Sequence, residues 1–524
     1  MTAPDQPDGG RPTGTDAPPA DDTPAGTRTP SGDTAPGRRS PEPDDRTRTH
    51  ENRPADRRHP RESPGADASG RAVAVRTASA SAAGRVLRPL RIEFRRGFVP
   101  WAAAALLFAL AWPITAAATR WQGSWGDTTD ELSAAAGAIA IPFCLAAGAW
   151  QGGRERRRRT TELWASTPRS PLARFLTAAL PPACALAGAY LVVVAGALLA
   201  CAPYASAGGP VPTVFAGSAL SIAACTVLGQ VAGRVLPWRL TAPALAICGY
   251  VLAAVGVRSS SGLAGLVPAS LRLFGDEDLP VWWYPLVSAL WTAGIAGAAV
   301  LVHAARRRVT ALLPLAAAFA AAVPLVHTGD GMLRDNPLAH HQVCDRSTTP
   351  QVCVNATHPG LLPEAARVLS GVTGRLRGVQ NLPVRFEDLP RRPRVDEAEL
   401  PSLTPLGWSS VRGRVADPER YAWQGAVNLI RPDCDATPSV RVQVVDEAVL
   451  RWLAPASVWK ADRELSVKLA RESDGTEHAA MLRAEDGAYA RLAALPAGER
   501  RSWLGRYFAT VGVCDPKASE VPAL

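Results

Sequence analysis

The sequence predicts a polytopic α-helical membrane protein with about six to seven transmembrane helices, a disordered N-terminal tail and a C-terminal α+β extracytoplasmic domain. Between residues 98 and 327, seven apolar stretches each approach the ~20 residues that a helix needs to cross a bilayer. Residues 1–82 are rich in Pro, Gly, Asp and Arg, and residues 328–524 have the mixed composition and length of one ordinary domain. We therefore divide the chain into segments 1–82, 83–327 and 328–524.

Segment 1–82 contains no aromatic residue and shows no hydrophobic periodicity, so it cannot bury enough apolar surface to offset the entropy of ordering. It also lacks the apolar core of a cleavable signal peptide. We expect a disordered cytoplasmic tail.

The segment from 83 to 98 reads AGRVLRPLRIEFRRGF and interleaves apolar side chains with five arginines. Such a segment can lie in the headgroup layer with its arginines at the lipid phosphates. A basic anchor without helical order is the alternative, and the sequence does not decide between the two.

The expected spans are residues 98–118, 132–150, 175–204, 211–231, 240–257, 281–302 and 309–326. Charged side chains are absent from these stretches, and Gln230 is one of the few polar residues in them. Polar residues of this kind more often join helices through hydrogen bonds than line a transport path.

Arginines alternate between the two sides of the predicted bundle. Acidic residues mark the opposite loops, at Asp127, Asp130, Glu131, Asp276, Glu277 and Asp278. The basic clusters are Arg85 to Arg96, Arg154 to Arg174, Arg234 with Arg239, and Arg306 to Arg308. The positive-inside rule places these clusters on the cytoplasmic side of a bacterial plasma membrane. The odd span count then puts the C-terminal domain outside. The net charge of +10 is mostly this arginine, so nucleic acid is not an expected partner.

The chain has no ATPase motif of its own. Its three lysines, Lys460, Lys468 and Lys517, do not follow glycine as the lysine of a P-loop does. Ion-coupled transporters usually keep a charged residue inside the bilayer, and the predicted spans have none. A transporter built this way would draw its energy from another polypeptide.

The loop after the second span offers a place for that polypeptide to dock. It contains RRRRTTELWASTPRSP, in which Thr160 or Thr161 is a plausible helix N-cap and Glu162 would lie in the first helical turn. A short cytoplasmic helix presenting Leu163 and Trp164 is expected. The candidate docking residues are Arg156, Arg157, Thr161, Glu162, Leu163 and Trp164. The alternative is an ordinary connector whose arginines only fix topology.

The basic lead-in, the first two spans and this loop together resemble the permease subunits of type-two ABC exporters from high-GC bacteria. The resemblance covers residues 84–302. It implies that the loop contains a coupling helix, that a separate nucleotide-binding ATPase subunit contacts this helix, and that a second permease copy can join the complex. The chain departs from the family norm of six spans by a seventh span and a large outer domain.

Nine cysteines divide between the spans and the outer domain. Cys344, Cys353, Cys434 and Cys514 form an even set in the region expected to face an oxidising space. Three pairings are possible, and we favour Cys344 with Cys353 and Cys434 with Cys514. A zinc site from His340, His341, Cys344 and Cys353 is the alternative, although its spacing matches no strong zinc pattern.

The outer domain shows no convincing enzymatic motif. It lacks His-Glu-x-x-His and Gly-x-Ser-x-Gly, and Ser457-x-x-Lys460 has no Lys-Thr-Gly companion. We therefore expect no catalytic residue, metal or cofactor. Helices are expected over residues 363–369 and 488–513, and a strand over 440–445. A membrane-anchored receptor or hydrolase, with the spans as anchor, remains the second functional hypothesis.

Overall fold

The computed structural model describes residues 97–157, 170–236, 238–258, 262–268, 277–403, 410–431, 439–472, 476–513, 516–517 and 519–524. The predicted tail and the segment 83–96 lie outside these residues, as do Thr161, Glu162, Leu163 and Trp164 of the docking loop. Cys434 and Cys514 lie outside them too.

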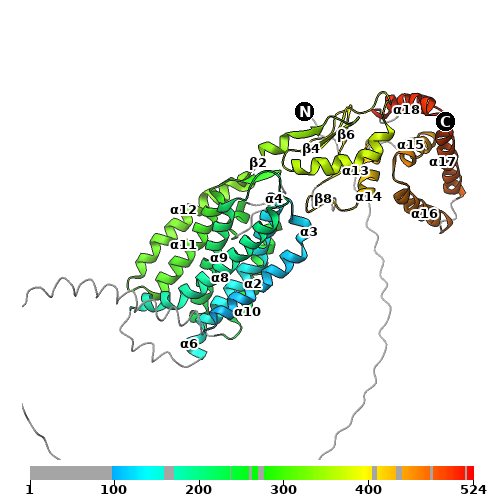
Figure 1. Ribbon diagram of the computed structural model, residues 1–524. Coiled ribbons are helices and arrows are strands. Elements are labelled where there is room, and N and C mark those ends of the chain that lie inside the picture. The colour runs from blue at the N-terminus through cyan, green and yellow to red at the C-terminus, as the bar shows by residue number, and fades with distance from the viewer. Residues whose placement is uncertain are drawn as a thin grey trace, which may run out of the picture. The chain divides into compact units, whose positions relative to one another are not determined.

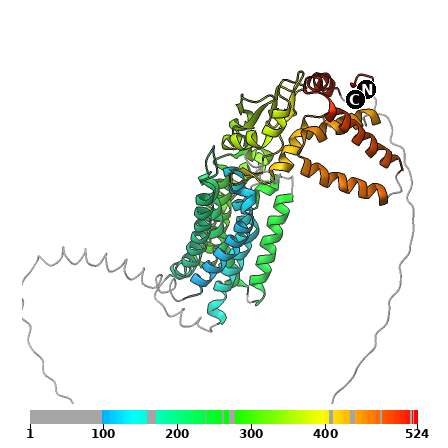
Figure 2. The same ribbon diagram turned by 45° about the vertical axis from the view of Figure 1, so that its right-hand side comes forward.

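Six of the described helical segments are long and apolar enough to cross a membrane, and Figures 1 and 2 show them side by side. A further helix, α10 (Thr241–Arg258), carries a shorter apolar stretch, Thr241–Gly256. The multi-span fold class is therefore confirmed: the described residues contain six full-length spans, and α10 adds a shorter apolar helix between α9 and α11. The six segments are α2 (Val99–Ala116); α4 (Trp125–Ala135) continuing through η1 (Ala136–Ala140) into α5 (Ile141–Gly152); α8 (Pro171–Cys201); α9 (Pro212–Val235); α11 (Tyr284–Ala304); and η3 (Arg308–Ala311) with α12 (Leu312–Thr328).

Local sequence signals explain where these helices begin. The Ser170 hydroxyl caps α8 by accepting a hydrogen bond from the Ala173 N–H, and Ser124 caps α4 in the same way. Because of the Ser124 cap, the second spanning helix begins at Trp125, well before the predicted residue 132. Asp127, Asp130 and Glu131 therefore lie in a helix, not in a loop as predicted.

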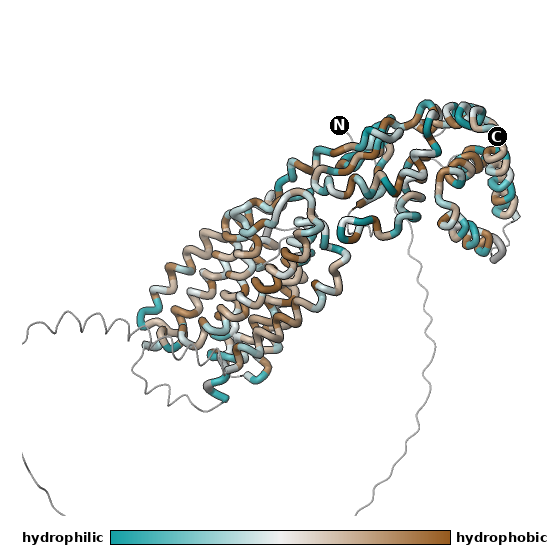
Figure 3. Tube along the Cα trace, in the orientation of Figure 1, coloured by the Kyte–Doolittle hydropathy of each residue, from teal (hydrophilic) through white to brown (hydrophobic). Residues whose placement is uncertain are grey.

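The bundle has one arginine-rich end, which we define by Arg154 to Arg157, Arg234, Arg239 and Arg306 to Arg308. The Arg156 Nη2 donates to the Arg234 carbonyl at 2.7 Å, which joins the ends of two spans there. Residues of high hydropathy dominate the helices between this end and the other (Figure 3). Many large ones are exposed in the protein, among them Trp101, Leu199 and Leu313, as expected for a surface covered by lipid. Which end faces the cytoplasm stays a prediction.

The C-terminal domain contains a four-stranded sheet with the strand order β3-β4-β5-β6. Strand β3 (Gln342–Asp345) pairs antiparallel with β4 (Gln351–Asn355). β4 pairs parallel with β5 (Arg385–Glu387), which in turn pairs parallel with β6 (Glu397–Glu399). The predicted disulfide is confirmed for Cys344 and Cys353, which lie directly opposite each other on β3 and β4. Both thiols are thus consumed, and the alternative zinc site is wrong.

Helices contain far more of this domain's described residues than its short strands do, in agreement with the α+β prediction with helix in excess. The core gathers Val352, Leu369, Phe386, Trp503 and Tyr507, all buried. The helices are α13 (Leu362–Arg375), α14 (Pro418–Asn428), α15 (Val440–Leu453), α16 (Ala456–Glu472), α17 (Thr476–Ala494) and α18 (Ala497–Val511).

Two local predictions in this domain need correction. Residues 440–445 are not a strand but the start of α15, because Val442, Val445 and Val449 recur at helical spacing and are buried on one face. The predicted helix 488–513 is divided between α17 and α18, with Pro496 as the N-cap of the second.

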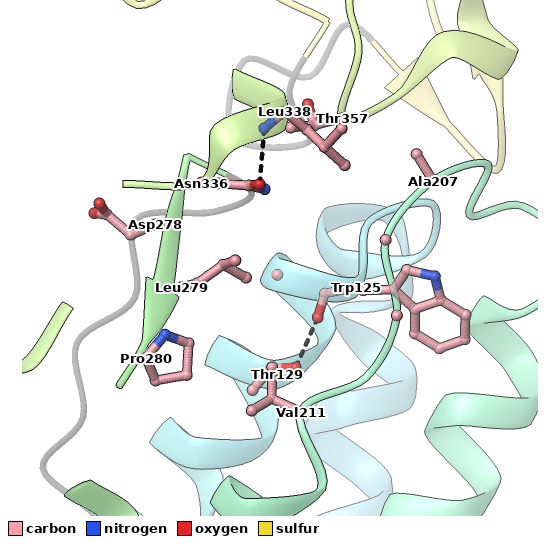
Figure 4. A pocket seen from close by; sticks show the side chains of 13 residues that line it. Trp125, Thr129, Ala207, Val211, Asp278, Leu279, Pro280, Asn336, Leu338 and Thr357 are labelled. Carbon is pink, nitrogen blue, oxygen red and sulfur yellow. Dashed lines mark hydrogen bonds between the residues drawn. The ribbon is translucent and has the colours of Figure 1, made fainter. Parts of the chain in front are cut away.

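Short polar contacts connect the bundle to the C-terminal domain. Strand β1 (Asp278–Pro280), before α11, pairs antiparallel with β2 (Leu333–Asp335), after α12. A cavity of about 40 Å³ lies beside β1. Figure 4 shows Leu279 and Pro280 of β1 and Thr129 of α4 among the residues that line it.

A tight hairpin makes a second connection. Strands β7 (Ser410–Val411) and β8 (Arg414–Val415) turn at Arg412 and Gly413, which both have positive φ. The Arg412 Nε donates to the Gln122 Oε1 at 2.7 Å. In a third contact, the Gly360 N–H donates to the Ser206 hydroxyl at 2.9 Å.

Candidate functional site

Two GxxxG motifs face each other at the arginine-rich end of the bundle. Gly148 and Gly152 lie on α5, and Gly229 and Gly233 lie on α9. A Cβ atom added to Gly148 would lie 2.1 Å from the Thr226 carbonyl oxygen, and one added to Gly233 would lie 2.1 Å from that of Ala149. No side chain fits at such distances, so the two backbones are in direct contact, as is typical of this motif in membranes.

The predicted docking loop begins immediately after this crossing. α5 ends at Gly152, and the short α6 (Arg154–Arg157) follows. The Arg157 guanidinium lies 4.1 Å above the Trp150 ring and donates to the Trp150 carbonyl, while Arg156 donates to the end of α9. The start of the loop is thereby fixed to both helices of the crossing.

The arginine-rich end also connects α8 and α11 to this crossing. The Arg234 guanidinium lies 4.8 Å from the centre of the Phe175 ring, and Phe175 contacts the His303 ring edge-on at 6.0 Å. Of the six predicted docking residues, the structure therefore places Arg156 and Arg157 on α6, at the end of the bundle where α5 and α9 meet. Thr161, Glu162, Leu163 and Trp164 remain predictions.

A cavity of about 650 Å³ lies at the other end, between the bundle and the C-terminal domain. Ligand pockets in proteins commonly have this size. The bundle contributes the residues around Ser124, the segment from Tyr204 to Ser206, and Glu277 just before β1, and the C-terminal domain contributes the rest of the wall. The wall contains both carboxylates and apolar residues, including Glu277, Leu361, Glu387, Asp388, Leu389, Glu399, Leu400 and Leu403.

One part of the wall is a continuous hydrogen-bond network. The His358 Nε2 donates to the Asp388 Oδ2 at 3.0 Å, and the other ring nitrogen lies 3.0 Å from the Thr357 hydroxyl. The Asn355 N–H also donates to the Asp388 Oδ2, and the Asn355 Oδ1 accepts from the Thr357 hydroxyl at 2.9 Å. This network holds an imidazole in a fixed orientation beside a carboxylate, in the wall of a cavity.

Two buried glutamates with opposite pKa shifts lie at Arg391, which lines the cavity: Glu387 also belongs to the wall, and Glu397 does not. Burial acts to raise the pKa of Glu397, but hydrogen bonds from Arg385, the Arg394 N–H and Arg391 outweigh it and lower the pKa to about 2. Burial raises the pKa of Glu387, and the Arg391 guanidinium only partly opposes this. The Arg391 Nη2 lies 2.7 Å from a Glu397 oxygen and 3.4 Å from the Glu387 Oε2.

The described residues contain no group of three or more His, Cys, Asp or Glu side chains that could hold a metal ion. Sequence reasoning missed both the crossing and the cavity. The GxxxG motifs were a readable signal for the crossing. The cavity had no such signal, because its residues come from distant loops between Gly123 and Gly413.

Comparison of the chain with models of known protein families, with curated proteins and with solved structures finds no match in any of the three.

Proposed function

We propose that this protein is the membrane-spanning permease subunit of an ABC transporter, energised by a separate ATPase subunit that docks on the loop after the second span. The observation that carries the proposal is the backbone contact between α5 and α9 at the start of that loop. A force applied at the loop would reach both helices, because no side chain lies between them to absorb it.

A second close contact lies further along α9. A Cβ atom on Gly217 would lie 2.5 Å from the Pro285 carbonyl oxygen, at the first turn of α11. Pro285 is close in sequence to β1, which borders the C-terminal domain. In this mechanism α9 transmits movement of the docking loop to the opposite end of the bundle. There the movement would open or close the substrate path, as alternating access requires.

The proposal requires the arginine-rich end to face the cytoplasm. A periplasmic-type phosphatase fused after Leu524 is expected to be active, and one fused after Arg159 inactive, because arginines retain their loops on the inner side. Activity should be compared at equal amounts of fusion protein in the membrane. The opposite pattern would contradict both the orientation and the ATPase docking proposal.

The docking loop gives the direct test of function. Interface energy concentrates in a few buried aromatic side chains, so Trp164→Ala is expected to weaken ATPase binding by about 2 kcal/mol or more. The measurement is the amount of ATPase that copurifies with the tagged protein in mild detergent. Trp101→Ala is the matched control, because Trp101 is exposed on α2 where lipid is expected. Equal recovery with both variants would show that Trp164 does not anchor a partner.

The cavity favours a second candidate function, in which the bundle anchors an outer receptor or hydrolase domain. An imidazole–carboxylate pair in the wall of a cavity suits ligand binding with or without transport. Failure of any ATPase to copurify with the wild-type protein would favour this second function.

A further inference from the structure

We propose that the cavity between the bundle and the C-terminal domain binds an organic cation, an amine or guanidinium group carried on an apolar body. This inference does not depend on the ATPase partner, because the site is formed by residues of this chain alone.

The charges in the wall favour a cation. Five carboxylates line the cavity, those of Asp127, Glu277, Glu387, Asp388 and Glu399, against the guanidinium groups of Arg391 and Arg392. Arg391 is already paired with Glu397, which reduces the positive charge that it presents to the cavity. Asp388 is likewise paired with His358, but carboxylates still outnumber the cationic groups, so the wall carries an excess of negative charge.

Glu387 is the residue that we expect to bind the positive charge of the ligand. Its side chain is only 1% exposed, yet its Oε2 accepts no hydrogen bond from the described residues. A buried carboxylate oxygen left in this state is costly unless another donor reaches it. The Nη2 of Arg391 is 3.4 Å away and lies closer to Glu397, so an ammonium or guanidinium donor would complete the coordination of Glu387.

The rest of the wall favours an apolar body over a bare ion. Leu361, Leu400 and Leu403 are buried in the C-terminal domain beside the cavity, and Tyr204 adds an aromatic ring from the bundle. A volume of about 650 Å³ is far larger than one ammonium group requires. Because no group of described side chains could hold a metal, an organic cation fits the wall better than a metal ion does.

The probe for the test is dansylcadaverine, a fluorescent primary amine with an apolar ring system. The full-length protein in detergent is expected to bind it saturably. The neutral N-acetyl derivative should bind about tenfold more weakly or worse, because it cannot form a charge-assisted bond with Glu387. Fluorescence anisotropy measures both affinities.

Two cavity variants and one control locate the site. Glu387→Gln preserves side-chain shape and should weaken dansylcadaverine binding by about tenfold or more. Glu399→Arg changes an exposed residue at the cavity and should weaken binding without altering the fold. Glu499→Gln is the control for Glu387→Gln, because it makes the same substitution on the exposed surface of α18. It should leave the affinity for dansylcadaverine unchanged.

Three results would overturn the proposal: no saturable binding to the wild-type protein, equal affinity for the amine and its acetylated form, or wild-type affinity in both cavity variants. A thermal melt of each variant separates loss of binding from loss of fold. ATPase recovery plays no part in these measurements, so the cavity proposal and the transporter proposal fail or survive separately.

Discussion

Gly148→Ala is expected to destabilise the membrane bundle by about 3 kcal/mol, a large effect for one added methyl group. The new Cβ would lie 2.1 Å from the Thr226 carbonyl oxygen and 3.0 Å from the Gln230 nitrogen. Both neighbours are backbone atoms, so no rotamer change can make room and the helices must separate. The measurement is the thermal stability of monodisperse protein in detergent.

Gly196→Ala is the matched control for this experiment. Gly196 lies in the spanning helix α8, and a Cβ there would meet nothing within 4 Å. Alanine also has the higher helix propensity, so this variant should be as stable as the wild type or slightly more stable. If Gly148→Ala and Gly196→Ala melt together, the close contact between α5 and α9 does not hold the bundle.

Arg431→Met is expected to destabilise the C-terminal domain by about 3–5 kcal/mol, the usual cost of removing one partner from a buried ion pair. The Arg431 side chain is 6% exposed, and its Nε donates to the Asp446 Oδ2 at 3.0 Å. Its Nη1 donates to the Thr510 carbonyl at 2.7 Å, and the Tyr507 hydroxyl donates to the other Asp446 oxygen. Burial already raises the pKa of Asp446, so without arginine the carboxylate would be buried with only a tyrosine as partner.

Arg367→Met makes the same chemical change in an exposed pair. Arg367 contacts Glu364 on the surface of α13, where water screens the charges and replaces the lost bonds. This variant should melt with the wild type. Unfolding of the C-terminal domain can be followed by tryptophan fluorescence, since Trp503 lies in its core beside Tyr507. Equal melting of the two arginine variants would contradict the importance of the buried network.

The spans could be predicted because a bilayer requires about 20 consecutive, mostly apolar residues in each spanning helix, and such a stretch can be found within the sequence itself. Their ends were harder to predict. The second spanning helix extends back to Trp125 because Ser124 caps it, and the predicted apolar window began only at residue 132. The α10 region met the apolar criterion in the sequence, but its apolar stretch is shorter than the six full-length spans.

The C-terminal domain was less readable, because short amphipathic segments satisfy more than one pattern. Alternating valines from Val440 to Val445 fit a strand, yet the same valines continue at helical spacing to Val449. The cavity could not be predicted from local patterns at all, because its residues meet only in the tertiary structure. His358 and Asp388 are separated by 30 residues and meet only because β4 and β5 are neighbours in the sheet.

The pairing of β1 with β2 turns α11 and α12 into a closed loop of chain. The strands flank this helical pair, and Asp278 to Pro280 pair with Leu333 to Asp335, so the hairpin of helices is tied across its open end. A structure fastened in this way can tilt as one rigid arm but cannot easily splay apart. Strand β2 also leads directly into the C-terminal domain. A tilt of α11 and α12 would therefore move β2 and, with it, the start of that domain.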